Sequence, residues 1–234
     1  MDSVTAEDLK RLAAEQAANH VESGMRLGLG TGSTVAHFLE LLGERLKTGQ
    51  LRDVAGVPTS RWTESEAGRL GIPLVVLADH PRLDLAVDGT DEVDPHTDLI
   101  KGMGGALLRE KMVAQAADHL LIIADESKSV DQLGTRSPLP VEVVAWEYES
   151  HIDFLTAKGA DVSVRRGEDG APFTSDNGNV ILDCRFPDGI ADPRALDQAL
   201  QARAGVVETG LFLGLADEVV IASRQGVRIM RREP

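Results

Sequence analysis

The sequence contains one cysteine, Cys184, and no apolar run approaching the ~18 residues of a membrane span. A single cysteine excludes an internal disulfide framework and fits a reducing cytosol. Cys184 lies in the apolar run VILDCRF, so we expect a buried small hydrophobe rather than a reactive thiol. The first residues, MDSVTAEDLKRLAAEQ, lack the apolar core of a secretory signal. We therefore expect a cytoplasmic protein that does not bind membranes.

Basic residues are also scarce, with 24 Lys and Arg against 38 Asp and Glu and a net charge of −14. This balance argues against nucleic-acid binding, which depends on neutralising phosphates with Lys and Arg. A small anionic ligand remains possible, because salt confines surface charge to roughly 8 Å and a few local donors can dominate. Apolar residues make up 42% of the chain, enough for a folded core.

Helical and strand patterns alternate along the first half of the chain. Helices are predicted at 5–22, 33–47, 60–70 and 105–117, and strands at 25–30, 54–58, 74–77, 83–88 and 119–125. This alternation predicts an α/β domain with a mostly parallel sheet and helices on both faces. We assign residues 1–132 and 211–234 to it, because strands at 218–223 and 226–231 form a hairpin that can rejoin the sheet.

The pattern changes near residue 133, where Pro138 and Pro140 interrupt the alternation. A β-α-β-β-α order follows, with strands at 141–146, 161–165 and 179–184, helices near 150–158 and 193–203, and a closing segment at 206–212. We therefore expect residues 133–210 to form a smaller inserted α+β domain.

Glycines and hydroxyls follow the first predicted strand in GLGTGST, residues 28–34. Free N–H groups at the start of the next helix favour an anion. A dinucleotide fingerprint needs glycine at position 33 and finds Ser33, and the Walker pattern lacks its lysine. The pattern therefore leaves two readings, phosphate binding without a dinucleotide and a tight structural turn.

Four carboxylates crowd the next loop, DGTDEVD, at Asp88, Asp91, Glu92 and Asp94. A solvated acidic loop, a divalent metal site and general acid–base chemistry all fit this composition. The spacing alone does not choose among them.

A second glycine turn follows in KGMGGALLREK, led by Lys101, one of six lysines. On the following helix Glu110 shares a face with small and apolar residues, namely Ala106, Leu107, Val113, Ala114 and Ala117. Burial there would raise its pKa from about 4.3 toward neutrality, as a general base requires. The alternative is an ordinary surface charge between Arg109 and Lys111. Lys128, just past the strand at 119–124, is either another surface charge or a ligand contact on the side where such sheets bind ligands.

In this order, GLGTGST, DGTDE, KGMGGALLREK and ADESK resemble the signature blocks of ribose-5-phosphate isomerase type A. The likeness continues through PLPVEV, SDNGNVILD and GVVETGLF, so it covers nearly the whole chain. The resemblance implies a Rossmann-like catalytic domain with a smaller α+β domain, assembled as a homodimer or homotetramer. It implies interconversion of ribose 5-phosphate and ribulose 5-phosphate in the pentose phosphate pathway, without metal or organic cofactor.

The resemblance also implies roles for individual residues. Glu110 matches the proton acceptor, while Asp88, Asp91 and Lys101 match polar residues around the reacting end of the sugar. Substrate contacts are implied for Thr31, Gly32, Ser33, Thr34, Gly89, Thr90, Gly102, Met103, Gly104 and Lys128. Met103 departs from the glycines usual in this turn, and it would be strained if its position needs a positive φ.

One alternative function belongs to another class, a sugar-phosphate sensor domain without catalysis. The chain starts directly with the first helix of the sheet domain, and its acidity disfavours DNA, so we expect the enzyme. The retained Glu110, Asp88 and Asp91 also favour catalysis over sensing.

Overall fold

A computed structural model describes residues 4–232. The chain divides into two compact units. The first comprises the described residues up to Thr90, then Arg109–Lys128 and the described residues from Gly214 onward. The second comprises Asp91–Leu108 and Ser129–Leu213. The second unit therefore contains residues 91–108, which the sequence pattern placed in the Rossmann-like domain.

The first unit is built on a six-stranded sheet in the order β13-β12-β6-β3-β1-β2. Its strands are β1 (Arg26–Leu29), β2 (Ala55–Pro58), β3 (Leu85–Asp88), β6 (Leu120–Asp125), β12 (Glu218–Ser223) and β13 (Gly226–Arg231). All neighbours are parallel except the β12–β13 hairpin. The predicted mostly parallel sheet, rejoined by a C-terminal hairpin, is confirmed.

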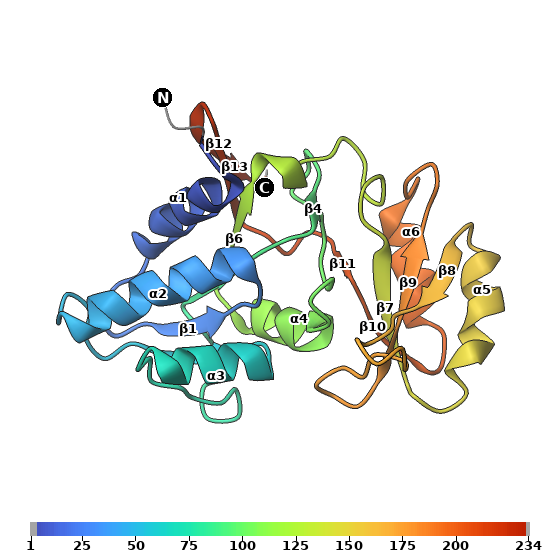
Figure 1. Ribbon diagram of the computed structural model, residues 1–234, viewed down its shortest axis with the longest axis horizontal. Helices are drawn as coiled ribbons and strands as arrows, with labels where there is room; N and C mark the ends of the chain where they lie inside the picture. Colours follow the sequence, from blue (N-terminus) through green and yellow to red (C-terminus); the bar gives the residue numbers. More distant parts are fainter. Residues whose placement is uncertain (1–3, 233–234) are drawn as a thin grey trace. The chain divides into compact units, whose positions relative to one another are not determined.

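Helices cover both faces of this sheet. They are α1 (Ala6–Ala18), α2 (Ser33–Lys47), α3 (Arg61–Arg69) and α4 (Leu107–Ala116). α1 and α2 lie side by side (Figure 1), and their apolar residues share one core with Leu27 and Leu29 of β1. The residue between them, Gly28, faces the other side, where a Cβ would lie 2.5 Å from Val113 of α4. Alternating residues of a strand thus meet different helices.

Two predicted elements in this unit differ from the structure. α1 starts as expected, with a capping box between Thr5 and Asp8, but ends at Ala18 instead of residue 22. The predicted strand at 74–77 is wrong, since only Leu74 forms an isolated bridge, to Gly56. The run lies beside the edge strand β2 and is bonded to it only around Gly56, and Val76 beyond this bridge is exposed.

The second unit contains two antiparallel sheets. One has the order β10-β7-β9-β8 and the other the order β11-β5-β4. The strands are β4 (Glu92–Val93), β5 (Leu99–Ile100), β7 (Leu139–Val143), β8 (Asp161–Val164), β9 (Val180–Arg185), β10 (Val206–Thr209) and β11 (Leu211–Phe212). The 3₁₀ helix η2 (Tyr148–His151) leads into α5 (Ile152–Thr156), which packs along β8, and α6 (Pro193–Gln201) packs against β10 (Figure 1).

The strands of this unit differ from the predicted ones in two places. The predicted closing strand at 206–212 splits into β10 and β11, which belong to different sheets, at Gly210. β4 and β5 were not predicted, because two residues are too few to show an alternating pattern.

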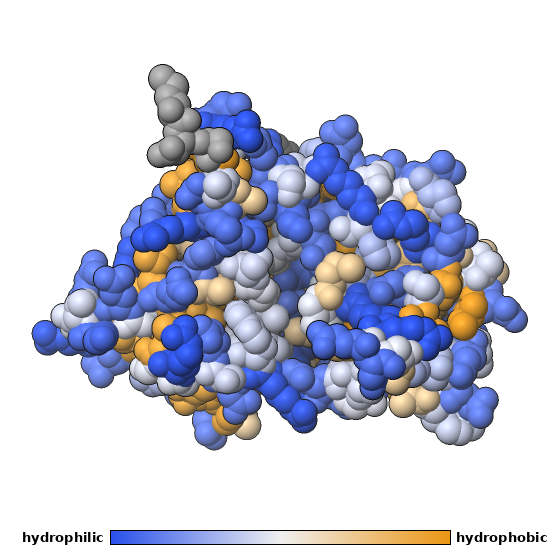
Figure 2. All heavy atoms as spheres, viewed as in Figure 1, coloured by the Kyte–Doolittle hydropathy of each residue, from blue (hydrophilic) through white to orange (hydrophobic). Residues whose placement is uncertain are grey.

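Hydrophilic residues cover most of the face seen in Figure 2, and hydrophobic residues appear there in separate patches. Between residues 4 and 232, no helix is long and apolar enough to cross a membrane.

Candidate active site

The residues predicted to form the site are divided between the two units. The first unit holds Thr31–Thr34, Asp88–Thr90, Glu110 and Lys128. The second holds Asp91 and Lys101–Gly104.

In the first unit, the loops after β1 and β3 are directly bonded. Oδ1 of the buried Asp88 accepts the N–H of Thr31 at 3.1 Å and that of Gly89 at 2.7 Å. The backbone packs so tightly that a Cβ on Gly30 would lie 2.2 Å from the same oxygen. Glycine at position 30 is therefore required by close approach to Asp88.

The Thr31 side chain is the centre of a hydroxyl cluster. Its Oγ1 lies 2.7 Å from Thr59 Oγ1, 2.8 Å from Ser60 Oγ and 2.9 Å from Thr63 Oγ1. Thr63 in turn donates to the carbonyl of Gly30 at 2.7 Å. The three partners are buried, so this network of neutral hydroxyls fixes the glycine turn from its interior side.

The turn ends at the start of α2. Gly32 is the N-cap, with φ of 125°, and it provides no side-chain cap. Ser33 and Thr34 begin the helix, and no acidic residue lies in its first turn. The start of α2 therefore lacks both a side-chain cap and an acidic residue, the two features that would compete with an anion at a helix N-terminus.

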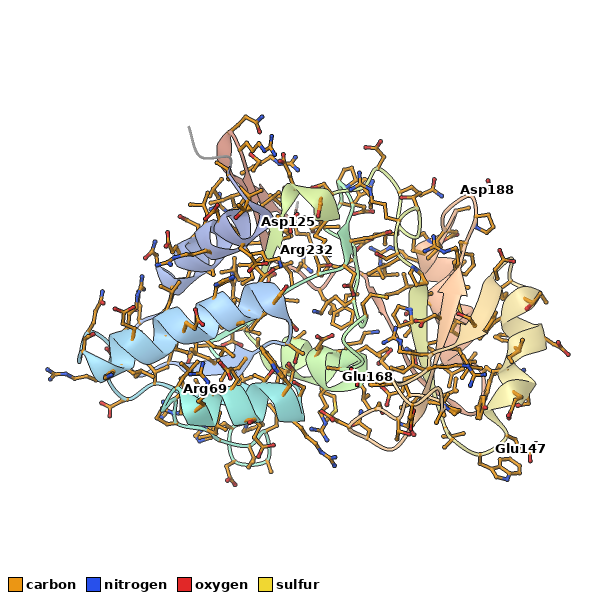
Figure 3. All side chains as sticks on the ribbon, in the orientation of Figure 1. Arg69, Asp125, Glu147, Glu168, Asp188 and Arg232 are labelled. Atoms are coloured by element: carbon orange, nitrogen blue, oxygen red, sulfur yellow. The ribbon has the colours of Figure 1, made fainter. Side chains whose placement is uncertain are left out.

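Two further residues of the first unit were predicted from sequence. Glu110 is 4% exposed, so the surface-charge reading is wrong and the carboxyl lies in the interior. Lys128 ends the 3₁₀ helix η1 (Glu126–Lys128), which follows β6, and is half-buried. Asp125, labelled in Figure 3 at the end of β6, accepts the N–H of Ser127 at 2.9 Å.

The four clustered carboxylates have separate structural surroundings. Glu92 is fully buried and accepts the N–H groups of Gly134, Arg136 and Ser137. Asp94 accepts those of His96 and Asp98, both at 2.9 Å. Burial raises the pKa of Asp94. The solvated-loop reading is therefore wrong for Glu92 and Asp94. Among residues 4–232, no group of three or more His, Cys, Asp or Glu side chains is arranged to hold a metal ion.

In the second unit, Lys101 is 3% exposed, and its Nζ lies 5.5 Å from the centre of the Phe212 ring. Its backbone N–H donates to Gly210 at 2.9 Å. A Cβ on Gly210 would lie 2.3 Å from the Lys101 carbonyl oxygen. The glycine that divides β10 from β11 therefore allows the chain to pass close to Lys101.

The turn after Lys101 needs glycine at two positions, Gly102 with φ of 104° and Gly105 with φ of 79°. Met103 has no positive φ, so the strain considered for this position is absent. Its N–H donates to Asp91 Oδ2 at 3.0 Å. The structure thus brings Asp91 and the Lys101 turn together.

Comparison with known proteins supports one family throughout. The profile described as "Ribose 5-phosphate isomerase A (phosphoriboisomerase A)" matches residues 55–226. The ribose-5-phosphate isomerase A of Roseiflexus castenholzii is 54% identical over 218 residues, covering 93% of each chain. The probable chloroplastic ribose-5-phosphate isomerase 3 of Arabidopsis thaliana is 46% identical, covering 98% of this chain and 85% of its own. This chain belongs to the ribose 5-phosphate isomerase A family.

Solved structures of the family agree with this assignment. A ribose-5-phosphate isomerase in complex with phospho-erythronic acid is 41% identical with a TM-score of 0.95, covering 97% of this chain and 100% of its own. The Plasmodium falciparum enzyme is 40% identical with a TM-score of 0.94 and the same coverage. The predicted fold class and family are confirmed.

Sequence reasoning missed residues that hold the two glycine turns of this family member. Thr59, Ser60 and Thr63 follow β2, and their hydroxyls were not linked to the first turn. Arg165 donates to the carbonyls of Gly102 and Met103 across more than sixty residues of sequence. A run of three hydroxyl residues after a strand was a visible signal for the first group. The arginine at the end of an alternating strand gave no such signal.

Proposed function

We propose that this chain interconverts D-ribose 5-phosphate and D-ribulose 5-phosphate, an aldose–ketose isomerisation of the pentose phosphate pathway. The observation that carries the proposal is family membership along nearly the whole chain, at 54% identity to a ribose-5-phosphate isomerase A. The aldehyde and ketone forms differ by the position of a proton on C1 or C2. An enediolate that can be reprotonated on either carbon is the intermediate of this proposal.

Glu110 is the base that removes the proton from one carbon and returns it to the other. A carboxylate shielded from water holds a proton more readily than an exposed one, which suits a base that acts near neutral pH. The burial of Glu110 supports this role.

Lys101 stabilises the negative charge that develops on the enediolate oxygen, together with N–H groups of the Gly102–Gly104 turn. A fixed cation in a site that excludes water contributes several kcal/mol to such a transition state. The burial of Lys101 and the two positive-φ glycines that shape the turn support this assignment.

Ring opening needs a proton transfer between the ring oxygen and a sugar hydroxyl. We assign this step to Asp88 or Asp91. Both are held in place by backbone N–H donors, which leaves each carboxylate fixed in orientation.

The substrate's phosphate is bound by Lys128 and by the turn that contains Thr31, Gly32, Ser33 and Thr34. A helix start without an acidic residue or side-chain cap favours a dianion. Gly89, Thr90 and Met103 contact the sugar in this proposal, and the reaction uses neither metal nor organic cofactor.

The enzyme works in the cytoplasm as a homodimer or homotetramer, with no nucleic-acid or membrane partner. The single buried cysteine fits a reducing compartment. Sedimentation of the purified chain tests the assembly, and a monomer at working concentration would contradict it.

A coupled assay of the purified chain with ribose 5-phosphate tests the activity. We expect turnover that phospho-erythronic acid inhibits competitively, since a family member was solved with that compound. A crystal structure of this chain with the same compound tests the residue roles, because it fixes both ends of the ligand. Binding without turnover would instead support the sensor alternative.

A further inference from the structure

We propose that Arg165 is a positioning residue that holds the turn after Lys101, residues 102–105, in the geometry that the reaction needs. This inference rests on the proposed isomerase function. Arg165 directly follows β8 (Asp161–Val164), far in sequence from every residue with a proposed role.

Arg165 binds the turn through two carbonyls. Its Nη1 donates to the Gly102 carbonyl at 2.8 Å and to the Met103 carbonyl at 3.0 Å. Nη2 also lies 3.8 Å from Met103 Sδ. One guanidinium therefore contacts two successive peptide groups and a side chain of the same turn.

The peptide between Gly102 and Met103 is held at both ends. Its carbonyl accepts from Arg165, and its N–H donates to Asp91 Oδ2 at 3.0 Å. Because carbonyl and N–H point in opposite directions in a trans peptide, these two bonds fix its rotation. The orientation of this peptide and that of the Asp91 carboxylate are thus coupled to Arg165.

The next peptide, between Met103 and Gly104, is held at its carbonyl. Its carbonyl, on Met103, accepts from Arg165, so the N–H of Gly104 points away from the guanidinium. Gly104 is an exposed residue, and in the proposed function its N–H binds an oxygen of the ligand. Arg165 thereby sets the direction of a donor that the proposed function uses for the enediolate.

Asp183 of β9 fixes Arg165 in turn. The two side chains form a bidentate ion pair, with Nε–Oδ2 at 3.0 Å and Nη2–Oδ1 at 2.5 Å. Their side chains are 11% and 16% exposed. The Phe173 ring lies 6.0 Å from the guanidinium and also packs on the turn, where a Cβ on Gly105 would lie 2.7 Å from it.

These contacts distinguish a positioning role from phosphate binding. A guanidinium has five N–H donors, and here they meet five acceptors: two carbonyls, two carboxylate oxygens and a thioether. No donor is left to bind a substrate phosphate. Lysine has the charge but not the planar fork, so Arg165→Lys removes the geometry and keeps the charge.

The test compares Arg165→Lys with Arg203→Lys as a matched control. Arg203 is also a half-buried arginine of the second unit, stacked on Phe154 and bonded to His151, but it contacts no proposed site residue. We expect kcat of Arg165→Lys to fall ~10- to 100-fold with KM nearly unchanged, since misplaced donors affect the transition state most. Arg203→Lys should keep the wild-type kcat.

Asp183→Asn provides a second variant that keeps the side-chain shape. It should lower kcat less than Arg165→Lys, and the double variant should resemble Arg165→Lys alone, because both act through one contact. Wild-type kcat in folded Arg165→Lys, or equal losses in Arg165→Lys and Arg203→Lys, would overturn the proposal.

Amide hydrogen exchange separates this proposal from the proposed function. Exchange of the 102–105 amides should be faster in Arg165→Lys than in wild type and unchanged in Arg203→Lys. Unchanged exchange in both variants would overturn the positioning role. If the wild-type chain is inactive on ribose 5-phosphate while exchange is faster in Arg165→Lys, the isomerase proposal is contradicted and the positioning role of Arg165 is supported.

Discussion

The two glycine turns of this chain are held by different chemistry. The turn at residues 30–34 is fixed by neutral hydroxyls, with Thr31 at the centre, and by the Asp88 carboxylate. The turn at 102–105 is fixed by a guanidinium paired with a carboxylate, together with Asp91.

The neighbouring strands explain the difference. The first turn leaves β1 between two parallel strands, β2 and β3, whose ends supply hydroxyl and carboxylate partners within a few residues. The second leaves β5, a two-residue strand between β11 and β4, where Asp91 directly before β4 accepts the Met103 N–H. The carbonyls of Gly102 and Met103 accept from Arg165, a long side chain that directly follows β8 of the other sheet. Hydroxyls that hydrogen-bond one another can be buried in full at low cost, whereas a buried guanidinium needs its own ion pair.

The largest effect should come from adding one methyl group to the first turn, in Gly30→Ala. The new Cβ would lie 2.2 Å from Asp88 Oδ1 and 2.7 Å from its Cα, so the loop after β3 must move. We expect a loss of ~10²-fold in kcat, the scale of a displaced catalytic group, and about 1–3 kcal/mol of stability. Steady-state kinetics and thermal unfolding measure both.

The matched change in the second turn is Met103→Gly. Met103 has no positive φ, so the substitution relieves no strain. It should lower the free energy of unfolding by only about 0.5–1 kcal/mol, because glycine gives the unfolded chain more conformational freedom. Equal losses of unfolding free energy in Gly30→Ala and Met103→Gly would contradict the expectation that only the first turn is intolerant of a change at this position.

Removing one hydroxyl should have a smaller effect. Thr63→Val keeps the shape but leaves the Gly30 carbonyl without its 2.7 Å donor, which should lower the free energy of unfolding by about 1–3 kcal/mol. Denaturant titration measures it, with the exposed Thr156→Val as control. A loss no greater than that of the control would show that the hydroxyl cluster does not hold the turn.

The second unit should lose stability in mild acid. Burial, with a smaller contribution from the Arg203 charge, lowers the pKa of His151 below its ordinary value of 6.5. As pH falls, the His151 imidazole is therefore protonated in the unfolded chain before it is protonated in the folded chain. The stability that the neutral imidazole contributes is present above pH 6.5 and is lost as pH falls toward the folded-state pKa. Melting temperature against pH should fall less steeply for His151→Asn, whose oxygen can still accept from Arg203. Identical slopes would refute this assignment.

The smallest effect concerns Cys184. Burial raises the pKa of its thiol to about 12, so no thiolate is available near neutral pH. We expect no labelling of the native chain by iodoacetamide and one label per chain in denaturant, read by mass spectrometry. Rapid labelling under native conditions would contradict the buried position.

Sequence patterns predicted the helices and strands whose own residues mark their ends and their buried face. The helix at Ser33–Lys47 and the strands at 218–223 and 226–231 have the predicted bounds, because glycine and periodic apolar residues mark their ends. The predicted strand at 74–77 is wrong because the segment pairs with β2 only around Gly56, and an apolar run does not reveal how many residues continue the pairing. The interior position of Glu110 could be proposed from its helical face but not decided.

The contacts that hold the site were less visible. Arg165 and Gly102 are 63 residues apart, and no local pattern links a strand-ending arginine to a distant carbonyl. Glu92 looked like its neighbouring carboxylates, yet it binds three backbone N–H groups around residue 135. Partner choice across long sequence separations depends on packing, which one sequence does not display.

The most direct test of the account follows the C2 deuterium of labelled ribose 5-phosphate by NMR. Glu110→Gln keeps the side-chain volume but removes the base, so we expect deuterium loss to fall at least ~10²-fold while phospho-erythronic acid still binds. Glu44→Gln, an exposed change on α2, is the control and should behave as wild type. Deuterium loss at the wild-type rate in Glu110→Gln would contradict the role of this buried carboxylate.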